Sequence, residues 1–272
     1  MAEKSQSVYQ FLELSSPDEP LILSGPPRKI RGKIEIANNG SQRVRVRDAS
    51  IHSPTKKTRK GTTVMPGPQR LVPVVLRPGH TRRVPLSLAL DPHTPPGEYQ
   101  AELTIGDRIK PVTLNVVENI ELNISPGRFV LANEAGATVT RRVVLTNQGN
   151  VPLKIGEIGA VPLDDDLIVC RTLRAALKAV DEDREKKTEK EEEPTLSDYV
   201  AEIFHQAKII LDKAGNLRVH NKTGEVTIPP GGSTAIDLEI RLPDTLEKRT
   251  RYFGTAAIYT SQLTFVIVPT TQ

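Results

Sequence analysis

An internal repeat, diverged and divided into two blocks, sets the architecture that this 272-residue chain can adopt. In the first block, residues 36–40 (IANNG) align with residues 145–149 (LTNQG) at an offset of 109. In the second block, residues 77–79 (RPG) align with residues 229–231 (PPG) at an offset of 152. Because the second offset is larger by 43, the second copy carries about 43 additional residues between its two blocks.

Each copy has the same order of strands and turns. A strand of alternating polarity ends in Asn-x-Gly, which is a turn signal, and a later Pro-Gly turn precedes a long alternating strand. An alternation of period two places one face of a strand in a core and the other in solvent. About seven short strands per copy, each bounded by turns, are typical of a β-sandwich. The aligned apolar positions are Val44, Val84, Leu86, Leu88 and Leu90 with Leu153, Ile236, Leu238, Ile240 and Leu242, and Leu114 and Val116 with Val266 and Val268.

These markers, together with residues 95–99 (PPGEY), resemble a bacterial family of immunoglobulin-like modules. The modules are similar to the domains found beside carbohydrate-binding modules in bacterial galactosidases and to PapD/Hydin-type sandwiches. The resemblance covers both copies, but residues 246–250 (LEKRT) replace the Pro-Pro-Gly turn in the second. It implies a non-catalytic spacer or interaction module and assigns no catalytic residue. We therefore expect an all-β chain of two tandem immunoglobulin-like β-sandwiches, residues 1–118 and 119–272, the second with a helical insertion.

Composition narrows the class of protein further. The single cysteine, Cys170, excludes a disulfide framework within the chain. Aromatic residues make up 4% of the chain and Trp is absent, which argues against a stacking platform for sugars or single-stranded nucleic acid. The N-terminus has no signal-like apolar run, and no stretch approaches the roughly 20 apolar residues of a membrane span. We expect a cytoplasmic protein, or one of the cell envelope or secreted if a leader is missing from this chain.

The additional residues fall at about 171–215, which is the part of the chain that predicts helix. Apolar spacing indicates a short helix over 173–180, and the charged segment 181–193 after it predicts a solvated link. A second helix is expected between a capping Ser197 and a stop at Gly215. Its apolar stripe comprises Val200, Ile203, Phe204, Ala207, Ile210 and Leu211. This stripe either packs on its own domain, which is the commoner role of such helices, or docks onto a partner protein.

Basic residues gather in the first copy, where residues 1–118 hold 18 Lys+Arg against 11 Asp+Glu. Arg43, Arg45 and Arg47 alternate with valines, so one strand presents three guanidinium groups to solvent. The next segment carries further cations, namely Lys56, Lys57, Arg59 and Lys60. Together these residues form a candidate patch for an anionic partner. The plainer interpretation is a charged outer strand face that discourages edge-to-edge association.

No pattern of catalytic chemistry is present. The five histidines form no metal-binding motif, and Cys170 has no CxxC mate. The run Asp164-Asp165-Asp166 has the ligand type for Ca²⁺ but lacks the EF-hand spacing, and a solvated junction is the favoured interpretation. The nucleophile-elbow, phosphate-loop and dinucleotide motifs are also absent. We expect no catalytic residue, no metal and no cofactor, and therefore no enzyme.

These observations favour a structural or adaptor protein that bridges or positions partner proteins in a larger assembly. The alternative is a binding module for an anionic ligand, read by the basic first domain: a nucleic-acid backbone, an acidic glycan or an acidic protein. A protein partner is the favoured one, and nucleic acid ranks below it because aromatic side chains are scarce.

Overall fold

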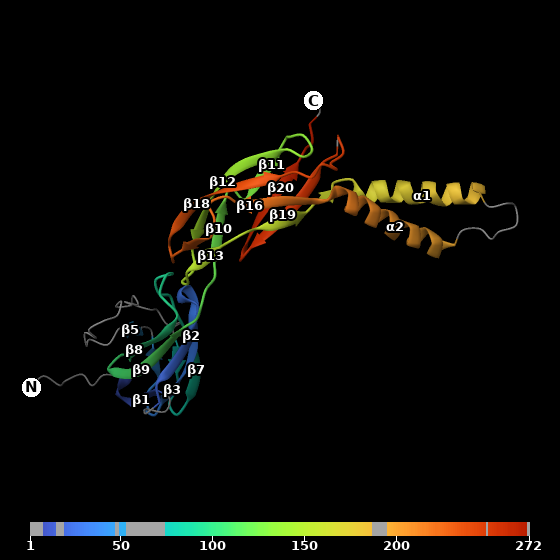
Figure 1. The fold of residues 1–272 in the computed structure, drawn as a ribbon. Helices are drawn as coiled ribbons and strands as arrows, with labels where there is room; N and C mark the ends of the chain where they lie inside the picture. The colour runs from blue at the N-terminus through green and yellow to red at the C-terminus, as the bar shows by residue number, and fades with distance from the viewer. Residues whose placement is uncertain are drawn as a thin grey trace, which may run out of the picture. The chain divides into compact units, whose positions relative to one another are not determined.

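The computed structural model describes residues 8–14, 19–46, 49–52, 74–186, 195–248 and 250–270 (Figure 1). The chain divides into two compact units. The first comprises Met1–Ile120 with Gln148–Pro152, and the second comprises Glu121–Asn147 with Leu153–Gln272.

The first unit is built from strands around an aliphatic core. Its strands are β1 (Leu12–Leu14), β2 (Leu21–Gly25), β3 (Ile30–Asn38), β4 (Val44–Val46), β5 (Ser50–His52), β6 (Val74–Leu76), β7 (Thr81–Leu88), β8 (Gly97–Ile105) and β9 (Arg108–Val116), with short 3₁₀ helices η1 (Val8–Phe11) and η2 (Pro27–Lys29). β3 pairs antiparallel with β1 and β7, and β2 pairs parallel with β9, which is followed by β8 and β5. A single antiparallel pair between Ser24 and Arg31 joins β2 to β3, so these seven strands are connected as one sheet. β4 pairs with β6. The inward side chains, among them Leu23, Ile34 and Leu103, are fully buried, as the period of two predicts.

The second unit has the same layers with additions. Its strands are β10 (Leu122–Ser125), β11 (Arg128–Leu131), β12 (Thr138–Asn147), β13 (Leu153–Ile155), β14 (Gly159–Pro162), β15 (Asp164–Asp165), β16 (Asn216–Asn221), β17 (Val226–Ile228), β18 (Ser233–Arg241), β19 (Tyr252–Ile258) and β20 (Ser261–Ile267). Among the described residues, the two main sheets have the orders β10-β12-β18-β16-β14 and β11-β20-β19-β15. Phe129 and Phe265 pack with ring centroids 6.2 Å apart and are both buried. Helices α1 (Ile168–Lys186) and α2 (Leu196–Ala214) are inserted between β15 and β16.

The chain therefore has the predicted fold: immunoglobulin-like β-sandwiches, the second with a helical insertion. In both units the first part of the chain contributes to both layers. β1 pairs antiparallel with β3 while β2 pairs parallel with β9, and β10 and β11 pair in the same way with β12 and β20. Strands that divide themselves between two layers in this way tie the layers together at their edge.

Strand register confirms the repeat for the central strands. Ile36 lies opposite Arg82 in the β3–β7 pair, and Leu145 lies opposite Thr234 in the β12–β18 pair. These positions are related by the offsets 109 and 152. The small β4–β6 and β13–β17 pairs obey the same offsets, because Val44 is opposite Leu76 and Leu153 is opposite Ile228.

The alignment of the last strands was wrong by one residue. Leu114 is buried and was matched with Val266, yet the β8–β9 turn joins Ile105 to Arg108 and the β19–β20 turn joins Ile258 to Ser261, an offset of 153. Val116 is buried, but its expected match Val268 is 37% exposed. The second copy has one more residue in the connection from β18 to β19, where LEKRT replaces the Pro-Pro-Gly turn. A one-residue slip reverses the face on which every side chain of a strand lies.

The asparagine of each Asn-x-Gly motif does more than mark a turn. Asn38 and Asn147 are fully buried at equivalent strand ends. The Asn38 side-chain amide donates to the Leu76 carbonyl at 3.2 Å, and the Asn147 amide donates to the Ile228 carbonyl at 3.0 Å. Each asparagine thus bonds the long strand to the end of the small strand pair beside it. We name Asn38 and Asn147 the hub asparagines.

Candidate functional site

The helical insertion leaves and re-enters the second unit at one place. β14 pairs antiparallel with β16, and the Leu163 amide donates to the Gly215 carbonyl at 3.4 Å, so the two ends of the insertion lie side by side. α1 and α2 contact each other, lie closest where they leave the sandwich, and draw apart toward their far ends as they extend away from it (Figure 1). We call α1 and α2 together the helical hairpin.

The first helix is longer than the sequence indicated. α1 begins at Ile168 rather than near residue 173, and it continues to Lys186 through part of the charged segment that we expected to be a link. Lys178 and Glu182 form an ion pair at 3.3 Å one turn apart within it. Such pairs support a helix only weakly, so packing against α2 supplies most of the stabilisation. The rest of the expected link, residues 187–193, lies outside the described residues.

The ends of α2 have identifiable caps. Thr195, not Ser197, is the N-cap: the Asp198 carboxylate accepts from the Thr195 amide at 2.8 Å and from its hydroxyl at 2.7 Å. Asp198 also lies in the first turn, where a negative charge is favourable. Gly215 ends the helix as expected, with a φ of 71° that a residue with a Cβ adopts at a cost.

Three charged residues fix the base of the hairpin. Arg171 on α1 binds both Asp165, from β15, and Glu247 through ion pairs. The Asp165 side chain is only 1% exposed, and its second oxygen accepts from the Leu167 amide at 2.8 Å at the start of α1. This buried carboxylate therefore ties the first turn of α1 to the edge of the sandwich. We call Asp165, Arg171 and Glu247 the base clamp.

The base clamp changes the pKa of its central cation. Burial alone would lower the pKa of Arg171, but the charges of Asp165 and Glu247 and their hydrogen bonds raise it above its usual value. Arg171 therefore stays charged at any pH at which the protein is folded. Arg171 is thus a fixed positive charge that joins α1 to both carboxylates.

The apolar stripe predicted on α2 divides into two parts. Ile203, Ala207 and Ile210 are half-buried in the hairpin, while Val200, Phe204 and Leu211 are exposed. Phe204 is 71% exposed although it is the largest apolar side chain of the stripe. The two expected roles of the stripe thus fall on different residues. The row of Ile203, Ala207 and Ile210 packs within the protein, whereas the row beside it is not buried by any described part of the chain.

Sequence reasoning missed a second exposed row, on α1. Val169, Leu173 and Leu177 are exposed, and the exposed fraction of Val169 is 68%. On α2, Leu196 is 81% exposed and adds to the row of Val200, Phe204 and Leu211. Leu173 and Leu177 had already indicated a helix by their spacing. The same spacing of four residues extended back to Val169 is the signal that could have found the row. We name these seven residues the apolar face of the hairpin: Val169, Leu173, Leu177, Leu196, Val200, Phe204 and Leu211.

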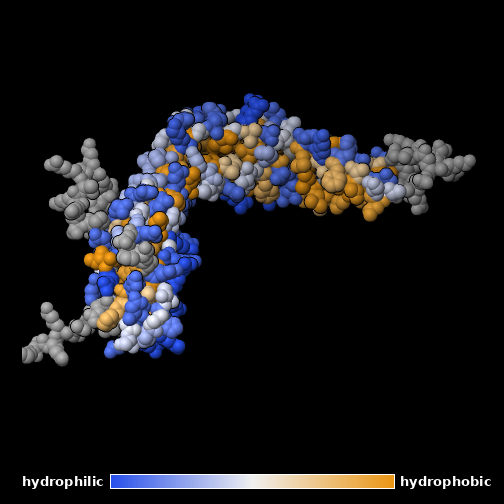
Figure 2. Space-filling view, turned by 90° about the horizontal axis from the view of Figure 1, so that it is seen from below, coloured by the Kyte–Doolittle hydropathy of each residue, from blue (hydrophilic) through white to orange (hydrophobic). Residues whose placement is uncertain are grey.

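Both rows lie on the same side of the hairpin. Six of the seven exposed residues directly follow a buried or half-buried residue, as Leu173 follows buried Thr172 and Phe204 follows half-buried Ile203. One residue is a turn of about 100° in the same sense on each helix. The two helices run antiparallel and face each other with their inward rows. The same rotation from the inward row on each helix therefore points both exposed rows to the same side of the hairpin. Figure 2 shows an orange area over the helical arm with a blue strip beside it.

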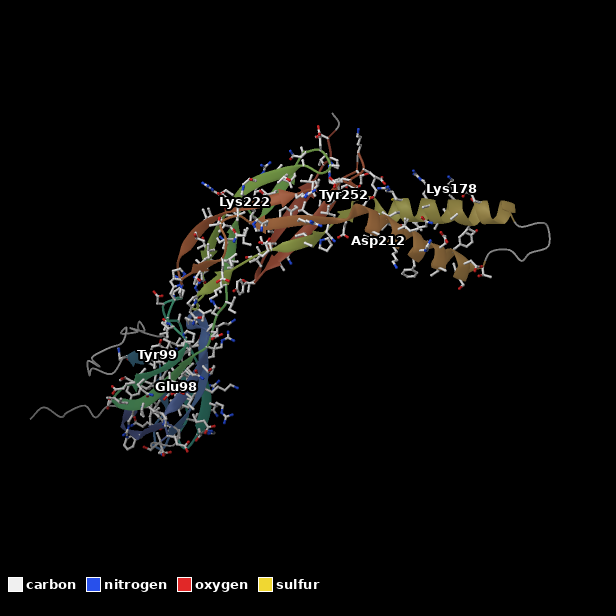
Figure 3. The ribbon with its side chains drawn as sticks, viewed as in Figure 1. Glu98, Tyr99, Lys178, Asp212, Lys222 and Tyr252 are labelled. Carbon is white, nitrogen blue, oxygen red and sulfur yellow. The ribbon has the colours of Figure 1, made fainter. Side chains whose placement is uncertain are left out.

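The other side of the hairpin is polar. It carries the Lys178–Glu182 ion pair and a hydrogen bond of 2.7 Å from Gln206 to Glu202. In Figure 3, Lys178 on α1 and Asp212 on α2 extend away from the hairpin into solvent. A two-helix layer with one polar and one apolar side is half of a packed helical structure.

One buried group in the hairpin is unsatisfied. The Thr172 hydroxyl on α1 is buried and, among the described residues, has no hydrogen-bond partner. Replacing Thr172→Val removes this desolvation cost at constant shape, so the free energy of unfolding of the hairpin should rise by roughly 1–2 kcal/mol. Native-state hydrogen exchange of α1 amides measures it. Thr172→Ser, which keeps the hydroxyl, should give no gain; equal protection in both variants would contradict the assignment.

The basic patch of the first unit is only partly described. Arg43 and Arg45 are exposed, and Arg45 lies on the solvent side of β4 between buried Val44 and Val46. The remaining members, Arg47, Lys56, Lys57, Arg59 and Lys60, lie outside the described residues. The anionic-partner hypothesis therefore stays a prediction from the sequence.

The described residues contain no cluster of three His, Cys, Asp or Glu side chains that could hold a metal ion. In the Asp164-Asp165-Asp166 run, Asp165 is occupied by the base clamp and Asp166 lies 4.0 Å from Arg251. His220 contacts Glu157 at 2.7 Å on the surface. Cys170 is a free, exposed thiol. Neither described helix has the length and apolar character needed to cross a membrane.

Comparisons with known proteins add little to this picture. No protein-family model matches the chain, and no curated protein matches it. Similar solved structures include a protein of unknown function from Porphyromonas gingivalis W83 (14% identity, 95% of this chain and 99% of that chain, TM-score 0.25). They also include the Pseudomonas aeruginosa CupB2 chaperone (8% identity, 93% of this chain and 98% of that chain, TM-score 0.27). A third is the class 5 fimbriae chaperone CfaA (11% identity, 95% of this chain and 100% of that chain, TM-score 0.25). At such TM-scores the likeness carries no argument, and the fold assignment rests on the strand pairings.

Proposed function

We propose that this protein is a non-catalytic adaptor that bridges or positions partner proteins through two immunoglobulin-like modules, residues 1–118 and 119–272, and the helical hairpin. The observation that carries the proposal is the apolar face. Seven large apolar side chains are exposed together on one side of two helices. A contiguous apolar surface of this kind marks an interaction site, since single exposed hydrophobic residues are common but grouped ones are not.

The base clamp supports this role. An adaptor must hold its docking surface at a defined orientation, and the ion pairs from Asp165 and Glu247 to Arg171 fix α1 at its first turn. Pre-organisation of a binding element reduces the entropy lost on association. The base clamp therefore holds the apolar face of the hairpin in a fixed orientation relative to the second sandwich.

Removing the hairpin is the direct test. Residues 167–214 are replaced by a short Gly-rich turn in the full chain, and Asp165→Asn is included so that no buried carboxylate loses its cation. Because Leu163 and Gly215 already lie side by side, the second sandwich should keep its strands, as circular dichroism measures. Affinity purification with mass spectrometry should show loss of the partner proteins that the unaltered chain retains. An unchanged partner profile would count against the proposal.

A finer pair of variants separates the face from the fold. Leu173→Ser with Phe204→Ser removes apolar contact area, whereas Lys178→Ser with His205→Ser changes exposed polar positions of the same two helices. Only the first pair should reduce partner recovery. Equal loss in both pairs would mean that the hairpin acts through its overall structure.

We further propose that the protein is cytoplasmic. Cys170 is exposed and free on α1, and such thiols persist in reducing compartments. Fractionation of cells that express the full chain should recover it with cytoplasmic markers. Recovery with an envelope fraction would contradict this part of the proposal.

A further inference from the structure

We infer that a pocket in the first unit binds a small carboxylic acid that carries an apolar chain. The pocket has a volume of about 390 Å³ and lies between β1 and the start of β9. Its lining comprises residues 11–14, Asn39 and residues 108–110, and we call it the β1–β9 pocket. The inference goes beyond the proposed function, since it concerns the other unit and makes no use of the helical hairpin.

The pocket lies where the pairing of β9 changes. β2 first pairs with β9 at Val112, so the residues from Arg108 to Pro111 extend beyond that pairing. Among the described residues, β1 pairs only with β3. The pocket therefore occupies a gap between two strands, β1 and β9, that approach each other without backbone pairing.

Hydrogen bonds close the same gap in the second unit. Leu122 is the equivalent of Leu12, because each lies opposite the hub asparagine of its own unit. The Leu122 amide donates to the Thr260 hydroxyl at 3.0 Å, and the Ser261 hydroxyl donates to the Leu122 carbonyl. Two short side chains thus bond β10 directly to the turn that begins β20.

The first unit has different residues at the positions of these hydroxyls. At the offset of 153, Asp107 replaces the threonine and Arg108 replaces the serine. An arginine carries its polar group on a long stem, so it needs far more room than a serine hydroxyl. The pocket therefore depends on residues of the first copy and does not follow from the shared fold alone.

The polar groups of the pocket favour an acid. Arg108 is exposed, whereas Lys110 is only 3% exposed. The acidic residue of the lining, Glu13, accepts from the Asn39 side-chain amide at 2.8 Å. A guanidinium has several N–H donors and an ammonium has three, so each can bond a ligand carboxylate in addition to its present partners. The excess of one positive charge over Glu13 matches a monoanion and favours a carboxylate over a phosphate.

The other groups of the pocket favour an apolar chain on that acid. Phe11 and Ile109 are large apolar side chains that remain exposed at the pocket, and the buried Leu12 and Leu14 also line it. A chain that covers them removes apolar surface from water. Since one water occupies about 30 Å³ of the liquid, the pocket has room for about 13 non-hydrogen atoms. A carboxylate with a chain of roughly eight to ten carbons has this size.

The first experiment titrates octanoate into the full chain by isothermal titration calorimetry. One octanoate per chain should bind, with a dissociation constant on the order of 100 μM. Octylammonium has the same chain and the opposite charge, so it should bind at least ~10-fold more weakly beside Arg108 and Lys110. No octanoate binding up to about 5 mM would overturn the inference, as would equal binding of the two compounds.

Two matched pairs of variants locate the site. Ile109→Ser should weaken octanoate binding roughly 5-fold, whereas Ile22→Ser, equally exposed but outside the pocket, should not change it. Arg108→Gln should weaken binding about 10-fold, and Arg31→Gln, an exposed arginine outside the pocket, should leave it unchanged. Circular dichroism verifies that the strands are kept. Equal losses within either pair would overturn the assignment of the pocket.

A protein C-terminus carries the same chemistry as a free acid. Acetylated leucyl-leucine with a free carboxylate represents that source in the same titration. Because a pocket for about 13 non-hydrogen atoms fits octanoate better, the dipeptide should bind more weakly. Tighter binding of the dipeptide would overturn a free acid as the ligand.

One further measurement keeps this inference apart from the proposed function. The variant Leu173→Ser with Phe204→Ser alters the apolar face of the hairpin and should bind octanoate as well as the unaltered chain does. Octanoate should also slow hydrogen exchange of amides in β1 and at the start of β9, and not in β10 or β20. Protection confined to the second unit would overturn the pocket as the site and leave the adaptor role standing.

Discussion

Replacing Asn147→Ala should lower the free energy of unfolding of the second unit by about 2–4 kcal/mol, far more than the loss of an average surface asparagine. The side chain is fully buried and donates to the Ile228 carbonyl. Its removal leaves that acceptor without its partner in a place that water does not reach, and it adds a small void. Hydrogen exchange of β12 and β18 amides measures the effect in the full chain.

The repeat supplies the matched experiment. Asn38→Ala should cost the first unit a similar amount, because Asn38 donates to the Leu76 carbonyl and to the Gln42 carbonyl at 2.7 Å. Exposed asparagines of the same units, Asn115 and Asn123, serve as controls and should change stability by less than about 0.5 kcal/mol when replaced by alanine. If both hub variants behaved like these controls, the buried bonds would carry no net stabilisation.

Breaking the base clamp should also lower the free energy of unfolding of the second unit by a large amount. Arg171→Met leaves the Asp165 carboxylate buried without its cation, which should cost the second unit about 3–5 kcal/mol. Thermal unfolding and hydrogen exchange near β15 and β19 report the change. The double variant Arg171→Met with Asp165→Asn should recover most of the loss, because the uncompensated charge is gone.

The control for the clamp lies one turn further along α1. Arg174 is exposed, so Arg174→Met should be nearly neutral. A double variant no more stable than Arg171→Met alone would show that the clamp acts through its packing and not through the pairing of charge.

Much of the fold was readable from local pattern. The period of two identified the long strands, because each has one face in the core and one in solvent. The two offsets placed the insertion, since β3 and β12 obey one offset and β7 and β18 the other. The register of the last strands was predicted wrongly because one extra residue in the connection before them changes the face of every side chain that follows. The sequence of that connection has no periodic pattern from which its length could be aligned.

The hub asparagines show why other features were not readable. Their motif was visible, but their partners lie 38 and 81 residues further along the chain. Only the folded sheet brings the Leu76 and Ile228 carbonyls beside them. The base clamp is similar, since Arg171 and Glu247 are 76 residues apart. Sequence reasoning found an apolar stripe on α2, but which half is buried depends on the helix that packs beside it.

The closed base of the helical hairpin has a consequence for how such a chain can change over time. Since the Leu163 amide already meets the Gly215 carbonyl, the segment beyond the base clamp is a single long loop for the sandwich, and the entropy of closing a loop grows only slowly with its length. The hairpin could therefore be lengthened, shortened or exchanged for another segment while the strands around it stay in register. Selection can then alter what the protein recognises without first rebuilding the scaffold that carries it.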